Sequence, residues 1–162
     1  SYGFRSKPAQ ERTQPSMTAT AFVLDASVTA AWLLPDDASE HTQRLYTRIR
    51  RDEVDPHAPN LWQWECGNLI ASGVNHGRIP HTSVEGLWGV LEAIRHRVEL
   101  HELAPAQHKA VLDVALDTGL PTYDAAYLWL AQSLRLPLAT FDAAQITAAR
   151  KSGVKLLAPE DF

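Results

Sequence analysis

The sequence predicts an α/β protein with a central, mainly parallel sheet. Short apolar runs typical of buried strands alternate with longer helical segments along almost the whole chain after residue 16, and this alternation favours parallel strands joined by helices. A second observation is local: Asp25 and Asp142 each follow an apolar strand-like run and precede an alanine-rich helix start. Ligands bind at the carboxyl ends of strands in such sheets, so the two aspartates are expected to share one crevice.

The first half of the chain is divided by residues that start and stop helices. Its expected elements are a strand at 21–24, a helix at 26–34, an amphipathic helix at 39–51, an extended connection at 54–59, and helices at 61–75 and 81–95. Pro35 stops the first helix. Asn60 is expected to be the N-cap of the helix over 61–75, which ends at His76 and Gly77.

The second half continues the alternation. Its expected elements are a strand at 98–103, a helix at 105–117, an apolar helix at 123–134, a strand at 138–141, a helix at 143–152 and a last strand at 154–157. Gly119 and Pro121 end the helix over 105–117.

Composition limits the class of protein. A chain of 162 residues with 45% hydrophobic and 21% charged residues is typical of one globular domain, which we place at 17–162. Residues 1–16 are polar, and we interpret them as an extension or tag that is flexible or docked on a partner. The single cysteine, Cys66, excludes an intramolecular disulfide and suits the cytoplasm. Apolar runs are too short to cross a membrane.

The net charge is −4 and the pI is about 5.9. These values argue against a protein that coats nucleic acid by bulk electrostatics. They leave a nuclease possible in which acids are concentrated in one metal site, because bound cations reverse the local sign where phosphate must approach.

Four acids stand out by position: Asp25, Glu65, Asp124 and Asp142. Each has a simpler interpretation. Asp25 and Asp142 can cap the helices that follow them, which stabilises a helix by about 1 kcal/mol. Asp124 can complement a helix dipole, with Thr122 as the cap. Glu65 can be an exposed helix residue.

Taken together, the four acids favour a metal site. Clustered carboxylates repel one another, and ionised groups in a partly dry crevice are costly unless they are paired or metal-bound. An all-oxygen ligand set suits Mg²⁺ or Mn²⁺. The seven histidines are scattered without zinc-like spacing, so zinc is disfavoured.

The segments that carry these acids resemble the PIN-domain ribonuclease family, and most closely its bacterial VapC-type toxins. The matching segments are V-L-D-A-S at 23–27, P-N-L-W-Q-W-E-C-G-N at 59–68, Y-D-A-A-Y-L-W-L-A at 123–131 and A-T-F-D at 139–142. The match spans about residues 20–157.

The resemblance implies a three-layer α/β/α sandwich and a metal-dependent endoribonuclease with the four acids as catalytic and metal-binding residues. It also implies that Ser27, Asn68 and Thr140 support the site. Proteins of this type pair with a cognate antitoxin, usually form homodimers and cut RNAs such as tRNA or rRNA. The sequence-based hypothesis is therefore hydrolysis of an RNA phosphodiester by a metal-activated water.

Other residues are open to two interpretations. Arg44, Arg48 and Arg51 fall on one helix face and can contact RNA, although a solvated basic face is the simpler explanation. Tyr127 can stack a base, but core packing is favoured, and His57 is expected in a surface loop. Trp62 and Trp64 are candidates for a dimer contact, while Cys66 is expected to be buried.

Three other classes of protein are alternatives to an active ribonuclease. The main alternative is a catalytically inactive PIN-like interaction module, which metal titration separates from a nuclease. A phosphotransfer enzyme or receiver domain is disfavoured because Ser27 and Leu24 stand where a second acid is required. A nucleotide-dependent enzyme is disfavoured because the chain has no glycine-rich phosphate loop.

Overall fold

A four-stranded parallel sheet lies at the centre of the computed structural model, which describes residues 20–162. The interpretation of residues 1–16 as an extension therefore falls outside the described part of the chain. The sheet order is β3-β2-β1-β4, and every strand pair is parallel. The strands are β1 (Thr20–Leu24), β2 (Val54–Pro59), β3 (Glu99–His101) and β4 (Leu138–Ala139).

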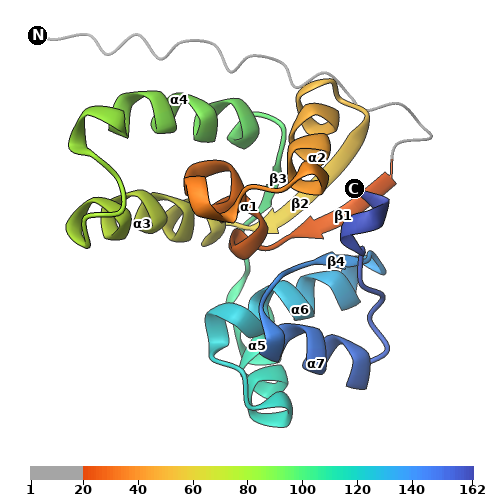
Figure 1. Ribbon diagram of the computed structural model, residues 1–162. Helices are drawn as coiled ribbons and strands as arrows, with labels where there is room; N and C mark the ends of the chain where they lie inside the picture. The colour runs from red at the N-terminus through yellow and green to blue at the C-terminus, as the bar shows by residue number, and fades with distance from the viewer. Residues whose placement is uncertain (1–19) are drawn as a thin grey trace, which may run out of the picture.

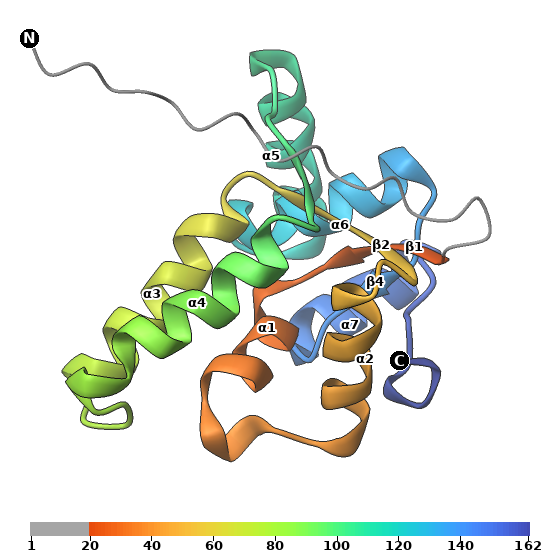
Figure 2. The same ribbon diagram turned by 90° about the horizontal axis from the view of Figure 1, so that it is seen from above.

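Helices cover both faces of the sheet. The helices are α1 (Ala26–Leu33), α2 (Glu40–Arg50), α3 (Trp62–Asn75), α4 (Val84–Arg95), α5 (Pro105–Thr118), α6 (Thr122–Leu134) and α7 (Ala143–Lys151). The first four lie on one side of the sheet and α5 to α7 on the other, as Figure 1 shows; Figure 2 gives the view from above. This is the expected α/β/α sandwich.

The helix ends follow from local chemistry. Ser39 and Thr42 form a capping box at the start of α2, in which each side chain accepts from the other residue's backbone N–H. Gly119 ends α5 in the left-handed region with φ of 76°, a conformation that glycine adopts without a steric penalty. Both ends agree closely with the predicted boundaries.

Several local predictions are wrong. Asn60 is not the N-cap of α3: Leu61 takes that position and no side chain caps the helix. The segment 54–59 is strand β2, not a connection, because it pairs on both sides with β1 and β3. The expected strand at 138–141 is only two residues long, and 154–157 contributes one isolated bridge between Leu138 and Leu156.

The core places the carboxyl ends of the central strands in a dry environment. Phe22, Val23 and Leu24 of β1 are fully buried. So is most of α6, including Tyr127 and Leu128, which explains the apolar character of that helix. The acids at the ends of these elements therefore stand at the margin of the core, where desolvation is expensive.

No helix within residues 20–162 combines the length and the apolar character that a membrane span requires.

Candidate metal centre

Asp25 is the most buried of the four candidate acids, with 4% of its surface exposed. It follows the last residue of β1 and is the N-cap of α1, where its side chain accepts from the backbone N–H of Ser27. The simple capping role therefore holds. It does not exclude a second role, since a carboxylate has about four acceptor positions.

Two hydroxyl groups fix the Asp25 carboxylate. The hydroxyls of Ser27 and Thr140 both donate to Asp25 Oδ2, the latter at 2.9 Å. The same hydroxyls accept from backbone N–H groups of the next loop: Ser27 Oγ from Phe141 at 2.9 Å and Thr140 Oγ1 from Asp142 at 3.1 Å. Because each hydroxyl oxygen accepts from a backbone N–H, its own hydrogen is directed toward Asp25. These bonds connect the end of β1 to the loop that follows β4.

Asp142 is the N-cap of α7, and its Oδ1 accepts from the backbone N–H of Gln145 at 2.8 Å. The side chain of Gln145, which is fully buried, turns the other way and places Nε2 3.4 Å from Asp25 Oδ1. The same side chain also lowers the pKa of Asp124 against the effect of burial. One amide therefore acts on two of the acids, and its buried Oε1 has no hydrogen-bond partner within the described residues.

Glu65 enters from α3. Its Oε1 accepts a hydrogen bond of 2.7 Å from the hydroxyl of Tyr127 in α6. Burial raises the pKa of Glu65 to about 7, the hydrogen bond from Tyr127 opposes this rise, and the charges of Asp25 and Asp124 add to it. The contributions of Asp25 and Asp124 show that the negative charges of these two acids act on Glu65.

Asp124 stands in the first turn of α6. Burial raises its pKa, and so do the charges of Asp25 and Asp142. The pKa of Asp25 is likewise raised by burial, against the hydrogen bonds from Ser27 and Thr140. The four acids, which come from four different elements, therefore form one electrostatically coupled group.

No ion pair among residues 20–162 balances the charge of this group. Within residues 20–162, none of the ion pairs involves Asp25, Glu65, Asp124 or Asp142. An uncompensated group of carboxylates, partly withdrawn from water, is a strong attractor for a divalent cation. The donor set, all oxygen, fits Mg²⁺ or Mn²⁺.

The carboxylate oxygens of the four acids are farther apart than the ligand atoms of a metal ion that is fully enclosed by protein. In the part of the chain that the structure describes, ligand atoms within 4.8 Å of one another are found in one group of three, His57, Glu99 and His101, and not among the acids. Mg²⁺ usually retains several water molecules, so a wider spacing suits it. Two histidines that are far apart in the sequence, His57 and His101, therefore meet in the fold.

Tyr127 and Gln145 were missed as site residues by the sequence interpretation. Tyr127 packs in the core, as favoured, but its hydroxyl also contacts Glu65. The sequence does contain an indication of this contact with the site. Tyr127 lies three residues after Asp124 on the same helix and therefore on the same face. Gln145 is the only polar side chain in the first turn of α7.

The side chains of the other candidates form no hydrogen bond with the four acids within residues 20–162. Asn68 is exposed on α3, where it lines a surface pocket with Ser72 and Arg78. Arg48 lies in the last turn of α2, and Arg51 follows the helix directly. Because β2 begins at Val54, both arginines lie near the amino ends of the strands, whereas Asp25 and Asp142 follow the carboxyl ends. Arg48 faces Glu53 at 3.9 Å and contacts the backbone oxygen of Asp161 at 3.4 Å.

Arg44 lies one turn earlier on α2 and is exposed. Trp62 is fully buried and donates to Thr29 Oγ1 at 3.1 Å, so it cannot form a dimer contact, whereas Trp64 is 79% exposed. Cys66 is buried as predicted. His57 lies in β2, not in a surface loop.

Comparison with known proteins supports the same family. Ribonuclease VapC3 of Pyrobaculum aerophilum is 28% identical over 124 residues, which covers 74% of this chain and 88% of that protein. No model of a known protein family matches the chain. The resemblance to the PIN-domain ribonucleases is confirmed.

Two solved structures share the fold. PAE2754 of Pyrobaculum aerophilum has a TM-score of 0.60 at 23% identity, covering 81% of this chain and 87% of that one. FitAcB of Neisseria gonorrhoeae has a TM-score of 0.53 at 18% identity, covering 87% of this chain and 99% of that one. The fold is therefore a PIN-like α/β sandwich, as predicted.

Proposed function

We propose that this chain, similar to PIN-domain ribonucleases, is a Mg²⁺- or Mn²⁺-dependent endoribonuclease and the toxin of a toxin–antitoxin pair. The observation that carries the proposal is the coupling of four acids from separate elements, with no cation paired to them in residues 20–162. The similarity to Ribonuclease VapC3 supports RNA as the substrate.

Asp25, Glu65, Asp124 and Asp142 would hold the divalent cation. When bound, it supplies an activated water as nucleophile and charge stabilisation for the departing oxygen. The hydroxyls of Ser27 and Thr140 orient Asp25 and favour its ionised form, which opposes the rise of its pKa on burial.

Tyr127 and Gln145 position two further acids. The Tyr127 hydroxyl fixes the direction of Glu65 and favours its ionised form. The Gln145 amide donates to Asp25 and favours the ionised form of Asp124. Supporting contacts of this kind orient metal ligands, and their loss typically reduces metal affinity or activity by about 10–100-fold.

The partners implied by the resemblance remain part of this proposal. They are a tRNA or rRNA substrate, a cognate antitoxin and a second copy of the chain, in a cytoplasmic setting. The exposed side chains of Trp64 on α3 and Trp88 on α4 support a protein partner on this side of the molecule, since exposed tryptophans are enriched at interfaces.

The decisive experiment is incubation of the purified protein with total tRNA and rRNA, with Mg²⁺, Mn²⁺ or EDTA. We expect cleavage that requires the metal and is lost in Asp25→Asn, which should remain folded by circular dichroism. Asp117→Asn is the matched control, because Asp117 is an exposed acid on α5.

Metal-independent cleavage, or full activity in folded Asp25→Asn, contradicts the proposal. Absence of both cleavage and Mn²⁺ binding by isothermal titration would instead indicate a PIN-like interaction module.

A further inference from the structure

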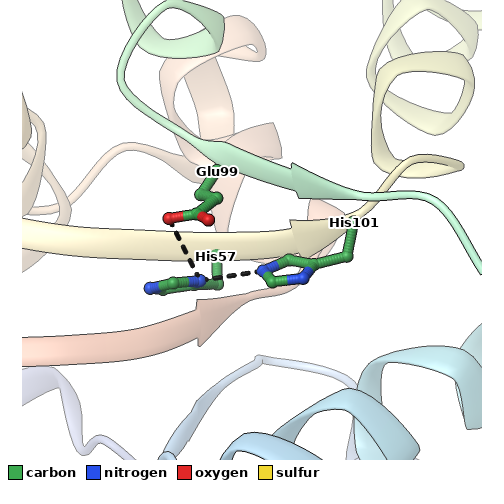
Figure 3. Close-up of side chains that lie close together, drawn as sticks. All are labelled: His57, Glu99 and His101. Carbon is green, nitrogen blue, oxygen red and sulfur yellow. Dashed lines mark hydrogen bonds and ion pairs between the residues drawn. The ribbon is translucent and has the colours of Figure 1, made fainter. Parts of the chain in front are cut away.

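A second cluster of metal-ligating side chains lies on the sheet itself. His57 projects from β2, and Glu99 and His101 project from β3, so that the three side chains point toward one another (Figure 3). His57 Nδ1 is 2.9 Å from His101 Nε2 and 3.8 Å from Glu99 Oε2. One ligand atom from each residue lies within 4.8 Å of the other two.

Strand register creates this cluster. The parallel pairing sets His57 opposite Glu99 and Pro59 opposite His101. Because successive side chains of a strand alternate between faces, positions 57, 99 and 101 share one face of the sheet. The three side chains are therefore mounted on hydrogen-bonded strands, which hold ligands more accurately than loops do.

We propose that His57, Glu99 and His101 bind a divalent transition metal of the zinc type, at a site separate from the four acids. Two imidazole nitrogens and one carboxylate form a ligand set that Zn²⁺ uses in proteins, whereas Mg²⁺ prefers oxygen alone. Two ligands about 2.0–2.1 Å from a tetrahedral ion lie roughly 3.3 Å apart. His57 Nδ1 lies 2.9 Å from His101 Nε2 and 3.8 Å from Glu99 Oε2, so the two separations fall on either side of that value.

A supporting carboxylate is already in place. Asp55 Oδ2 is 2.9 Å from His57 Nε2, on the side of the ring away from His101. A carboxylate at this nitrogen fixes the N–H there and directs the lone pair of Nδ1 to the opposite side, toward Glu99 and His101. Metal-binding histidines almost always have such a partner.

A simpler arrangement is a hydrogen-bonded histidine pair. In it, a proton lies between His57 Nδ1 and His101 Nε2, which are 2.9 Å apart, and Glu99 has no role. In the metal site, the ion takes the place of that proton and Glu99 becomes a ligand. The contribution of Glu99 therefore separates the two arrangements.

A metal here would fasten an edge strand that has only three residues. The backbone oxygen of His101 also accepts from the N–H of Asn60 at 2.8 Å, just before α3 begins. Because α3 carries Glu65, the ion would stabilise the part of the fold that presents this acid. The role inferred for the ion is to hold β3 against β2, with water in the fourth position of the tetrahedron.

The test is titration with ZnCl₂ by calorimetry and thermal unfolding, in an Asp25→Asn background that weakens the acidic site. We expect one equivalent of Zn²⁺ to bind and to raise Tm by about 5 °C when it is near saturation. An excess of Mg²⁺ should not displace it. Substitution by Co²⁺ should give visible absorption bands typical of nitrogen ligation.

Two variants decide the assignment. His101→Gln and Glu99→Gln should each weaken Zn²⁺ binding by roughly tenfold or more, since each removes a ligand. His108→Gln, which alters an exposed histidine on α5, is the control and should bind normally. Glu99→Gln is informative even if the histidine variant fails to fold, because Glu99 is exposed.

No Zn²⁺ binding by the Asp25→Asn protein, or unchanged affinity in folded Glu99→Gln, overturns the proposal. These results are independent of RNA cleavage, so they do not depend on the ribonuclease function.

Discussion

Thr140 and Asp25 are joined by a hydrogen bond of 2.9 Å between residues 115 positions apart in the chain. The Thr140 hydroxyl donates to Asp25 and accepts from the backbone N–H of Asp142 at 3.1 Å. One side chain therefore contacts both the most buried acid, whose ionised form it favours, and the backbone of the last one.

Thr140→Val tests this link, because valine has nearly the same shape but cannot donate. We expect Mn²⁺ affinity to fall by about 10–100-fold. The free energy of unfolding should decrease by about 1–3 kcal/mol, since an N–H group and a carboxylate lose a partner. Calorimetry and urea unfolding provide the measurements, and Thr47→Val, at an exposed position on α2, is the control. Unchanged affinity would show that Thr140 acts only in folding.

Tyr127→Phe removes the hydrogen bond to Glu65 while keeping the ring in the core. That bond lowers the pKa of Glu65, which stands at about 7 with it, so its loss should raise the pKa further. The pH profile of RNA cleavage should therefore move to higher pH. Tyr123→Phe, on the exposed side of the same helix, should leave the profile unchanged. An identical profile in both variants would remove Tyr127 from the site.

Metal-free protein should lose stability as the pH rises through the titration of Glu65. The pKa of Glu65 is about 7 in the folded state against 4.5 as the ordinary value. Between these values the folded state binds more protons than the unfolded state, so the free energy of unfolding falls as pH increases and levels off above about 7. Allowing for the partial exposure of Glu65, the loss is about 1–2 kcal/mol.

Glu65→Gln is expected to remove this loss. Measured by urea unfolding in EDTA, the variant should be more stable than the parent at pH 8 and equal to it at pH 4.5 or below. Equal stability at both values would mean that Glu65 titrates normally.

Gly73→Ala should destabilise the helix that presents Glu65. A methyl group at Gly73 would overlap Ile79 Cδ1 and lie 2.8 Å from Ile79 Cγ1, so Ile79 must move. Overpacking of this kind costs about 1–3 kcal/mol. Gly67→Ala is a matched control on the same helix: among residues 20–162, no atom outside its chain neighbours and the backbone of its own helix lies within 4 Å of the new methyl group. This second change should stabilise the protein by about 0.5–1 kcal/mol. Thermal unfolding separates the two, and equal effects would contradict the packing argument.

A Trp64 contact is testable by oligomeric state. Trp64→Glu places a charge where 79% of the side chain is exposed. We expect it to shift a dimer toward monomer in analytical ultracentrifugation, with folding unchanged because the residue contributes little to the core. Phe141→Glu, at another exposed aromatic, is the comparison. A dimer that persists in Trp64→Glu would place the contact elsewhere.

The sequence by itself determined the order and type of nearly all elements. Apolar periodicity, Pro35 and Gly119 act within a few residues, so their effects can be predicted without knowing the fold. The same is true of Asp25 and Asp142, because their places between a strand-like run and a helix start are local features. Element ends were less accurate: local signals favoured Asn60 as a cap, but the chain makes a further turn through Leu61 before α3 begins.

Only the tertiary structure decided which side chains meet. The Tyr127 hydroxyl of α6 contacts Glu65 of α3, and Gln145 of α7, which follows β4, contacts Asp25 at the end of the neighbouring strand β1. His57 and His101 are brought together by the register of β2 on β3, which cannot be read from their spacing of 44 residues. The physical reason is that helix and strand formation depends on neighbouring residues, whereas contacts between elements depend on how their buried faces pack.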